Sequence, residues 1–334
     1  MTPSERDAPA SPEALRALLG RPPAPDPLEV TEQNLVQAVD HVRVLVEYGT
    51  ALGERVQAWL LRPLGADEPT PGIAAIHQDG ERRPYAIGKS EPAGLKGDPE
   101  LAYGVELCRR GYTVLCPDRF PFESRSLARS RHRATFEAFA VHAHYGGQEI
   151  DVTADLYLGC VATSLLVRGW SFVGRTLFEL GRAVDVLAGL PDVDSQRIGA
   201  IGHSAGGFYA ALLMYLDQRI RVGCSSCGTF LLRWILGGDA LKPITGFGAL
   251  AVPGLLRWGD LDQVLAGLAP RPFLETEGDQ GIPPEMREAK VTRACRRYAA
   301  LGMPERFEVV VYPGGHAFPR DMRDRAYAWF DRWL

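Results

Sequence analysis

Residues 197–207 read RIGAIGHSAGG and contain a G-x-S-x-G pentapeptide, with Ser204 between Gly202 and Gly206. An apolar run precedes this pentapeptide and a helical pattern follows it, which is the strand–turn–helix context in which the motif presents a reactive serine. The turn is so tight that positions two residues either side of the serine must lack bulk, which explains both glycines. We predict that Ser204 is a nucleophile, the alternative being a glycine-rich turn that holds an unreactive serine.

Short apolar runs alternate with helical patterns along much of the chain. This alternation predicts an α/β fold, a mostly parallel twisted sheet with helices on both faces. We expect strands at 72–77, 112–116, 197–201, 220–224, 272–276 and 307–312, and helices at 12–19, 99–110, 206–216, 285–300 and 321–334. Ahead of them, the β-patterned runs 42–48 and 55–61 lie either side of Gly53 and predict an antiparallel hairpin.

Two segments depart from this alternation. Residues 1–27 are rich in proline and predict a loosely held N-terminal arm, so that residues 28–334 form the α/β domain. Between about 119 and 170 the chain is much longer than a plain connection requires. We predict a cap-like helical insertion there, over the sheet edge where ligands bind in open α/β folds. Residues 230–256 are a candidate second cover.

A serine hydroxyl needs a base, and the base needs an orienting carboxylate. In enzymes built on this turn the chain order is serine, acid, histidine. His316, in VVVYPGGHAF, is the only histidine after Ser204 and is therefore the predicted base. The acid should follow the preceding strand, in PFLETEGDQGIPP. We favour Asp279 as the acid, with Glu277 as its rival and Glu275 within the strand.

The negative charge that develops on a carbonyl oxygen needs two backbone donors. The N–H of Ala205, at the N-terminus of the helix after the serine, is the first predicted oxyanion donor. The second is expected on the loop AAIHQDGERR, from the N–H of Gln78 or Asp79. His77 would then be structural, whereas His203 lies beside the nucleophile and is a candidate substrate contact.

These motifs resemble the α/β-hydrolase superfamily, and within it the branch of the dienelactone hydrolases and acetyl xylan esterases. The resemblance runs from about Gly72 to the C-terminus and rests on IHQDGERR, RGYTVLCPDRFPFESRS, LPDVDSQRIGAIGHSAGG, APRPFLETEGDQGIPP and YPGGHAF. It implies a Ser204–His316–Asp279 triad, with oxyanion donors from Ala205 and the Gln78–Asp79 loop. Dienelactone hydrolases carry cysteine where this chain has Ser204, so the resemblance implies ordinary carboxylic ester cleavage.

The expected function is therefore that of a serine hydrolase, a carboxylesterase that cleaves a small to medium ester through an acyl-enzyme. The same triad also serves amide, peptide or C–C bond hydrolases and acyltransferases, and only the pocket chooses among them. A catalytically silent binding scaffold is the non-enzyme alternative, although such scaffolds usually lack a triad residue. We expect no organic cofactor and no metal.

Composition argues against nucleic acid and membranes as partners, so the expected partner is the small-molecule ester that the triad implies. The net charge of −4 offers no basic field for nucleic acid or anionic membranes. No secretory signal is visible and the six cysteines are scattered, which predicts free thiols in the cytoplasm. Cys224 and Cys227 form a lone C-x-x-C that we interpret as packing residues. The hairpin and the arm either form a homodimer interface or pack on the domain.

The substrate itself is not fixed by these patterns. Aromatic side chains around the insertion, Phe120 and Trp170 among them, either line an apolar pocket or belong to the core. The insertion also carries several arginines that hint at an acidic substrate group, although a solvated basic face is the favoured interpretation. These arginines are Arg119, Arg125, Arg129, Arg131 and Arg133.

Overall fold

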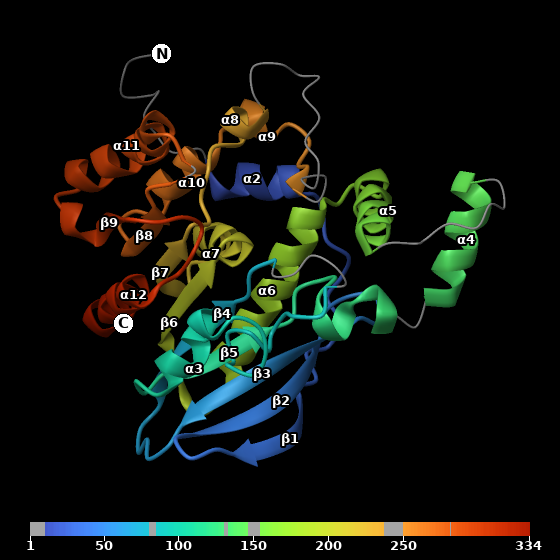
Figure 1. The fold of residues 1–334 in the computed structure, drawn as a ribbon, viewed down its shortest axis with the longest axis horizontal. Helices are drawn as coiled ribbons and strands as arrows, with labels where there is room; N and C mark the ends of the chain where they lie inside the picture. The colour runs from blue at the N-terminus through green and yellow to red at the C-terminus, as the bar shows by residue number, and fades with distance from the viewer. Residues whose placement is uncertain (1–10, 80–84, 130–132, 146–153, 237–249, 281) are drawn as a thin grey trace.

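A computed structural model describes residues 11–79, 85–129, 133–145, 154–236, 250–280 and 282–334 of the chain. These residues form a central sheet between layers of helices, as Figure 1 shows. Within these ranges, no helix combines the length and the apolar character that crossing a membrane requires.

The described residues form a sheet of nine strands in the order β1-β2-β3-β5-β4-β6-β7-β8-β9. The first three strands and β5 pair antiparallel, whereas all pairs from β5 to β9 are parallel. The predicted α/β fold with a mostly parallel sheet is confirmed. The strands are β1 Thr31–Gln37, β2 His41–Gly49, β3 Arg55–Pro63, β4 Thr70–Ile76, β5 Thr113–Pro117, β6 Val193–His203, β7 Ile220–Ser226, β8 Phe273–Gly278 and β9 Phe307–Tyr312.

The predicted hairpin is present as β2 and β3, whose register pairs His41 with Pro63 and Gly49 with Arg55. Strand β1 was not predicted. Its sequence TEQNLVQ is exposed at every position, so it lacks the alternation of apolar and polar residues by which a half-buried strand is recognised.

Strand β4 lies at the point where the chain changes direction across the sheet. From β4 the chain moves to β5, which lies on one side of β4. From β5 it crosses over to β6, which lies on the other side of β4. Such a switch point opens a crevice at the carboxyl ends of the strands. The register pairs Ile76 with Gly202, so the residues that follow β4 and β6 emerge side by side. The fold thus places the loop of Gln78 next to Ser204.

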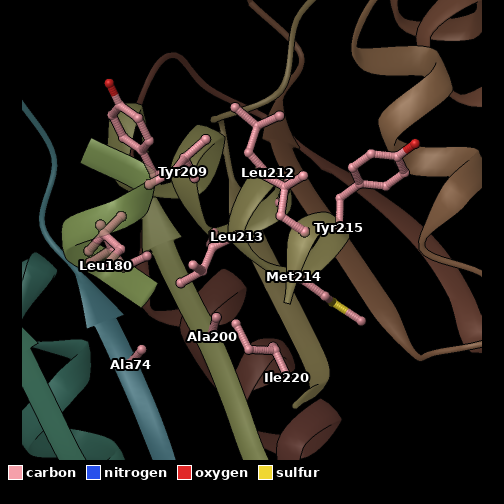
Figure 2. Packing of buried hydrophobic residues seen from close by; sticks show 14 of the residues in the cluster. Ala74, Leu180, Ala200, Tyr209, Leu212, Leu213, Met214, Tyr215 and Ile220 are labelled. Carbon is pink, nitrogen blue, oxygen red and sulfur yellow. The ribbon is translucent and has the colours of Figure 1, made fainter. Parts of the chain in front are cut away.

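The larger hydrophobic core lies between the sheet and the helices on one face. Helix α7 is buried at every position from Gly206 to Leu216, as expected of a helix that is apolar on all sides. Figure 2 shows Leu213 and Met214 of α7 near Ala200 of β6 and Ile220 of β7. The helices that contribute to this core are α2 Pro12–Leu19, α6 Phe172–Gly189, α7 Ala205–Leu216, α10 Leu261–Gly267 and α11 Pro284–Ala300.

The opposite face of the sheet is covered by α3, Tyr103–Cys108, and by the C-terminal helix α12, Arg320–Trp333. Gly199 of β6 shows how closely this layer approaches, since a Cβ there would lie 2.8 Å from the ring of Phe330. Because both faces are covered, the parallel strands read as continuous apolar runs in the sequence. Two short 3-10 helices lie in connections: η1 Pro99–Leu101 precedes α3, and η5 Pro304–Arg306 lies between α11 and β9.

Helix α2 of the predicted N-terminal arm packs into the core, so the expectation that the arm is loosely held is wrong for this helix. Ser11 caps α2 by accepting a hydrogen bond from the N–H of Ala14, and Leu15 and Leu19 are buried against the larger core. Gly20 then forms an isolated bridge with Trp170. The bounds of α2 agree with the predicted helix, while the division of the chain into arm and domain stays a prediction.

The segment between β5 and α6 contains η2 Glu123–Arg125, η3 Leu127–Arg129, α4 Arg133–Tyr145 and α5 Ala154–Val167. Helix α5 packs on Phe120, just after the carboxyl end of β5, and on Phe172 at the start of α6. Helix α4 stands apart from the sheet in Figure 1. A cap-like role for this insertion stays a prediction. Of the candidate second cover, α8 Leu232–Leu236 and α9 Leu255–Trp258 are seen, and residues 237–249 lie outside the described residues.

Candidate active site

Ser204 lies in the turn between β6 and α7, with φ 54° and ψ −125°. A positive φ in a residue with a side chain is rare and costs about 1–3 kcal/mol, so the surrounding structure must impose it. The N–H of Ser204 donates to the carbonyl oxygen of Ser226 at the end of β7 (2.7 Å), and its carbonyl accepts from the N–H of Phe208 (3.0 Å). These bonds fix the strained backbone and leave the hydroxyl at the carboxyl edge of the sheet.

Three glycines allow this turn to close. A Cβ on Gly202 would lie 2.2 Å from the carbonyl carbon of Gly206, and one on Gly206 would lie 2.0 Å from the carbonyl oxygen of Ile76. A Cβ on Gly207 would lie 2.7 Å from Oγ of Ser225. Since two of these contacts are with backbone, no side-chain movement relieves them. The absence of side chains that the pentapeptide predicted therefore has a steric cause.

His316 is the residue that the structure brings to Ser204. It follows β9 on the loop that contains Gly314 and Gly315, and its Nε2 lies 2.8 Å from the serine Oγ. Desolvation of the imidazole lowers the pKa of His316 below its ordinary value of 6.5, although the residue as a whole is exposed. A neutral imidazole at this distance can accept the serine proton, as a general base must.

Asp279 lies on the loop after β8 and is tied to the histidine loop through backbone groups. Its Oδ1 accepts a hydrogen bond from the N–H of Gly314 (2.9 Å), and its own N–H donates to the carbonyl of Tyr312 (2.8 Å). Among the described residues, no hydrogen bond joins Asp279 to His316. The structure thus brings the predicted acid to the loop of His316 without a direct bond between the two side chains, and its role as acid stays a prediction.

The rival acids, Glu275 and Glu277, are occupied elsewhere. Both are buried, and Nζ of Lys290 on α11 lies 3.2 Å from Glu275 and 2.7 Å from Glu277. Nε of Arg287 lies 2.6 Å from the other oxygen of Glu277. Carboxylates that neutralise buried cations are poor candidates to orient a histidine on another loop. This cluster of ion pairs was not predicted, because nothing in a single sequence shows which strand carboxylates face Lys290.

The two predicted oxyanion elements lie against each other. Ala205 begins α7, and the following Gly206 touches the carbonyl of Ile76, the last residue of β4. His77, the next residue, is fully buried, and its Nδ1 bonds the carbonyl oxygen of Gln78 at 2.6 Å. Burial holds the pKa of His77 well below 6.5, so its ring is neutral and structural. The donor roles of Ala205, Gln78 and Asp79 stay predictions.

His203 is packed between Phe318 and His316 rather than exposed beside Ser204. It is buried, its ring stacks on Phe318 with centroids 5.9 Å apart, and its Nδ1 lies 3.1 Å from Oγ of Ser226. Its centroid is 4.9 Å from that of His316. Burial, with a smaller effect of His316, lowers the pKa of His203 to about 3. A direct contact between His203 and substrate stays a prediction.

The ring contacts of the two aromatic candidates are with residues of α5 and α6. Phe120 packs with Tyr157 of α5 and Phe172, and the guanidinium carbon of Arg175 lies 4.4 Å from its ring centroid. Trp170 lines a cavity of about 930 Å³ between the arm, α6 and α7, and neither Ser204 nor His316 lines that cavity. Substrate contacts from Phe120 and Trp170 therefore stay predictions.

The arginines of the insertion do not form one solvated basic face, and that favoured interpretation is wrong for two of them. The side chains of Arg119 and Arg125 are buried and ion-paired, to Asp79 and to Glu179 respectively. Arg129 and Arg133 are exposed, and Arg131 lies outside the described residues. The burial of Arg119 was not predicted because it follows from the path of the loop after β5, which no local pattern encodes.

Comparison with known proteins agrees with this architecture. No family model matches the chain. The "Putative hydrolase YtaP" of Bacillus subtilis (strain 168) is 25% identical over 322 residues, which is 95% of this chain and 96% of YtaP. The crystal structure of a "putative acetyl xylan esterase" from Bacteroides fragilis superposes with a TM-score of 0.67 at 18% identity, covering 96% of this chain and 81% of that one. A glucuronoyl esterase from Solibacter usitatus gives 0.62 at 17% identity, covering 98% and 90%.

Fold and turn together define the class: the chain has the α/β-hydrolase fold, with a G-x-S-x-G serine at the turn after β6. This confirms the fold that the sequence resemblance implied.

The contacts of Gly206 predict that Gly206→Ala is strongly destabilising, because its Cβ would overlap a backbone oxygen at 2.0 Å. We expect the free energy of unfolding to fall by about 3 kcal/mol or more, or the variant to fail to fold. Gly181 of α6 is the matched control, since a Cβ there meets nothing within 4 Å. Gly181→Ala should raise the free energy of unfolding by about 0.5–1 kcal/mol. Urea denaturation measures both, and equal stability of the two variants would contradict this reading of the turn.

Proposed function

We propose that this protein is a serine hydrolase that cleaves carboxylic esters of small to medium size through an acyl-enzyme intermediate. The observation that carries the proposal is the 2.8 Å approach of His316 Nε2 to Oγ of Ser204, whose backbone is held at a positive φ. The esterase names of the two structures compared above support carboxylic esters as the substrate class.

In the proposed reaction, Oγ of Ser204 attacks the ester carbonyl while His316 Nε2 takes the hydroxyl proton. The carbonyl oxygen becomes an oxyanion, which accepts hydrogen bonds from the N–H of Ala205 and from the Gln78–Asp79 loop. His316 then gives its proton to the departing alcohol oxygen, and the bond between that oxygen and the acyl carbon breaks. A water molecule, deprotonated by His316, cleaves the acyl-enzyme and restores Ser204.

Asp279 is the proposed acid of this triad. It follows β8, it is tied to Gly314 two residues before His316, and its rivals neutralise Lys290 and Arg287 instead. Once His316 carries a second proton, a carboxylate on the adjacent loop stabilises the resulting imidazolium by charge.

The size of the acyl group is a separate part of the proposal. The names of the compared structures refer to acetyl esters and to glucuronoyl esters, which differ in the acid that the enzyme would hold. A substrate panel should therefore contain p-nitrophenyl esters from acetyl to dodecanoyl together with the methyl ester of glucuronic acid. We propose small to medium acyl groups, so turnover should be greatest at the short end of the p-nitrophenyl series.

We further propose that the protein acts in the cytoplasm. All six cysteines are free, and burial raises the pKa of the thiols of Cys108, Cys116 and Cys224, as expected of packing residues. A monomer and a homodimer are the two alternatives for its assembly, and sedimentation equilibrium distinguishes them.

Removing the nucleophile tests the reaction. Ser204→Ala should lower kcat on p-nitrophenyl acetate by on the order of 10⁶, and Asp279→Asn by on the order of 10⁴, because the triad acts as a unit. Steady-state kinetics measure both, with circular dichroism to establish folding. Glu285→Gln, at an exposed position of α11, is the control and should keep wild-type kcat. Activity retained by Ser204→Ala would refute the nucleophile, and activity retained by Asp279→Asn would refute only the acid.

The lowered pKa of His316 predicts how activity depends on pH. The base works only when neutral, and a group whose pKa is lowered stays neutral to lower pH. The value of kcat/KM should therefore be constant near neutral pH and fall only as pH drops through a midpoint below 6.5. Stopped-flow or steady-state assays between pH 4.5 and 8, at about constant ionic strength, measure this midpoint. A midpoint above 6.5 would show that a negative charge dominates the environment of His316.

A further inference from the structure

Arg119 makes three hydrogen bonds to the predicted oxyanion loop. It lies two residues after the end of β5, and its backbone N–H donates to Nε2 of His77 at 3.0 Å. Its Nε donates to the carbonyl oxygen of His77 at 3.2 Å, and its Nη2 donates to Oδ1 of Asp79 at 2.8 Å. The side chain is only 3% exposed, so these bonds form in a site from which water is largely excluded. Arg119 thus hydrogen-bonds both His77, the first residue of the loop, and Asp79, the last residue of the loop that the structure describes.

The guanidinium of Arg119 is itself held in place by two aromatic rings. Its central carbon lies 5.1 Å from the ring centroid of Phe122 and 5.1 Å from that of Tyr209. Both distances are within the range of a cation–π contact. Tyr209 belongs to α7, the helix that begins directly after Ser204. Arg119 therefore lies between the two elements that supply the predicted oxyanion donors, and its planar fork is oriented before any substrate arrives.

The hydrogen bond between His77 and Gln78 fixes the direction of the next N–H, that of Asp79. The carbonyl oxygen of Gln78 turns inward to Nδ1 of the fully buried His77. The peptide between Gln78 and Asp79 is trans, so its N–H points away from its C=O. The N–H of Asp79 therefore faces away from the buried imidazole, toward the outer side of the loop. This orientation leaves the N–H of Asp79 available to an oxyanion, and we assign the second donor to it.

A carboxylate at this position needs a partner. The side chain of Asp79 is 40% exposed and would repel a negative charge that develops nearby, because Coulomb interactions in such partly excluded sites are stronger than in water. The ion pair with Arg119 offsets this repulsion. The guanidinium binds the carboxylate and the His77 carbonyl at the same time, which a lysine ammonium on a flexible stem does not reproduce.

We propose that Arg119 is a positioning residue for ester hydrolysis: it fixes the His77–Asp79 loop so that the N–H of Asp79 faces the oxyanion, and it neutralises the Asp79 carboxylate. The inference rests on the proposed function, because it assigns a role within the same reaction. Arg119 touches no reacting atom in this account. Its effect should therefore appear in the transition state and hardly at all in the binding of the ground-state ester.

The test compares Arg119→Lys with Arg125→Lys in the full-length protein. Arg125 is the matched control, since its side chain is 7% exposed on the same loop but binds Glu54 and Glu179, not the oxyanion loop. Arg119→Lys should lower kcat on p-nitrophenyl acetate about 10- to 100-fold with KM changed less than about twofold, since losing one whole oxyanion donor costs about 10²- to 10³-fold. Arg125→Lys should keep kcat within about threefold. A general structural defect would lower the kcat of both variants alike.

A trifluoromethyl ketone provides a second readout, because Ser204 adds to its carbonyl and the resulting oxyanion occupies the same site. Its inhibition constant should rise in Arg119→Lys by about the same factor by which kcat/KM falls, and should stay unchanged in Arg125→Lys. If Arg119→Lys does not fold, Arg119→Gln replaces it: the amide removes the charge that neutralises Asp79 and should likewise lower kcat and weaken the inhibitor while leaving KM nearly unchanged.

The outcomes separate this inference from the proposed function. Suppose that the wild type is active and Ser204→Ala is inactive. If Arg119→Lys then has the same kcat and inhibition constant as the wild type, only the role of Arg119 is overturned. A rise in KM at unchanged kcat would also overturn it, because it would make Arg119 a contributor to ground-state binding. No turnover of any ester by the wild type would overturn the proposed function, and the role of Arg119 with it.

Discussion

The strained turn at Ser204 is the constraint on which the site depends. Its positive φ is held by the bond to Ser226, by the contact between Gly202 and Gly206, and by the approach of Gly206 to the carbonyl of Ile76. The same contacts that impose the strain set the distance between α7 and the end of β4. The same backbone contacts therefore position Ser204, the proposed nucleophile, and the loop of the proposed second oxyanion donor. Helix α7 is kept there by its burial from Gly206 to Leu216.

Buried ion pairs hold the loops around this turn. On one side, Lys290 of α11 lies between Glu275 and Glu277 beneath the Asp279 loop. On the other, Lys89 lies 3.0 Å from Asp118 and 2.8 Å from Glu123 in the loop after β5. Charges removed from water are tolerated only when well paired, and removing one partner typically costs about 3–5 kcal/mol. Such clusters admit few alternative arrangements, which favours rigid loops next to the reacting atoms.

Local patterns in the sequence predicted the parts of the fold that depend on local physics. The pentapeptide of Ser204, the hairpin of β2 and β3, and helix α2 each carry their signal within a few residues. The pairing of His316 with Ser204 was predicted because chain order left one histidine, and the structure brings the two together at 2.8 Å.

Features that depend on distant contacts were harder to predict. Strand β1 has no apolar face, and α6, whose amphipathic pattern was available, was not among the predicted helices. Arg119 was interpreted as a solvated surface residue although it is buried, because its partners His77 and Asp79 are about forty positions away in the chain. A contact between Asp279 and His316 would depend on side-chain rotamers across two loops, which spacing alone does not determine.

The central claim is that Ser204, activated by His316, is the nucleophile. The most direct test is to label the protein with a fluorophosphonate and to locate the adduct by mass spectrometry of its peptides, with His316→Ala as control. The account predicts one adduct, on the peptide that contains Ser204, with labelling slowed by several orders of magnitude in the control. An adduct on another residue, or equally fast labelling of His316→Ala, would contradict it.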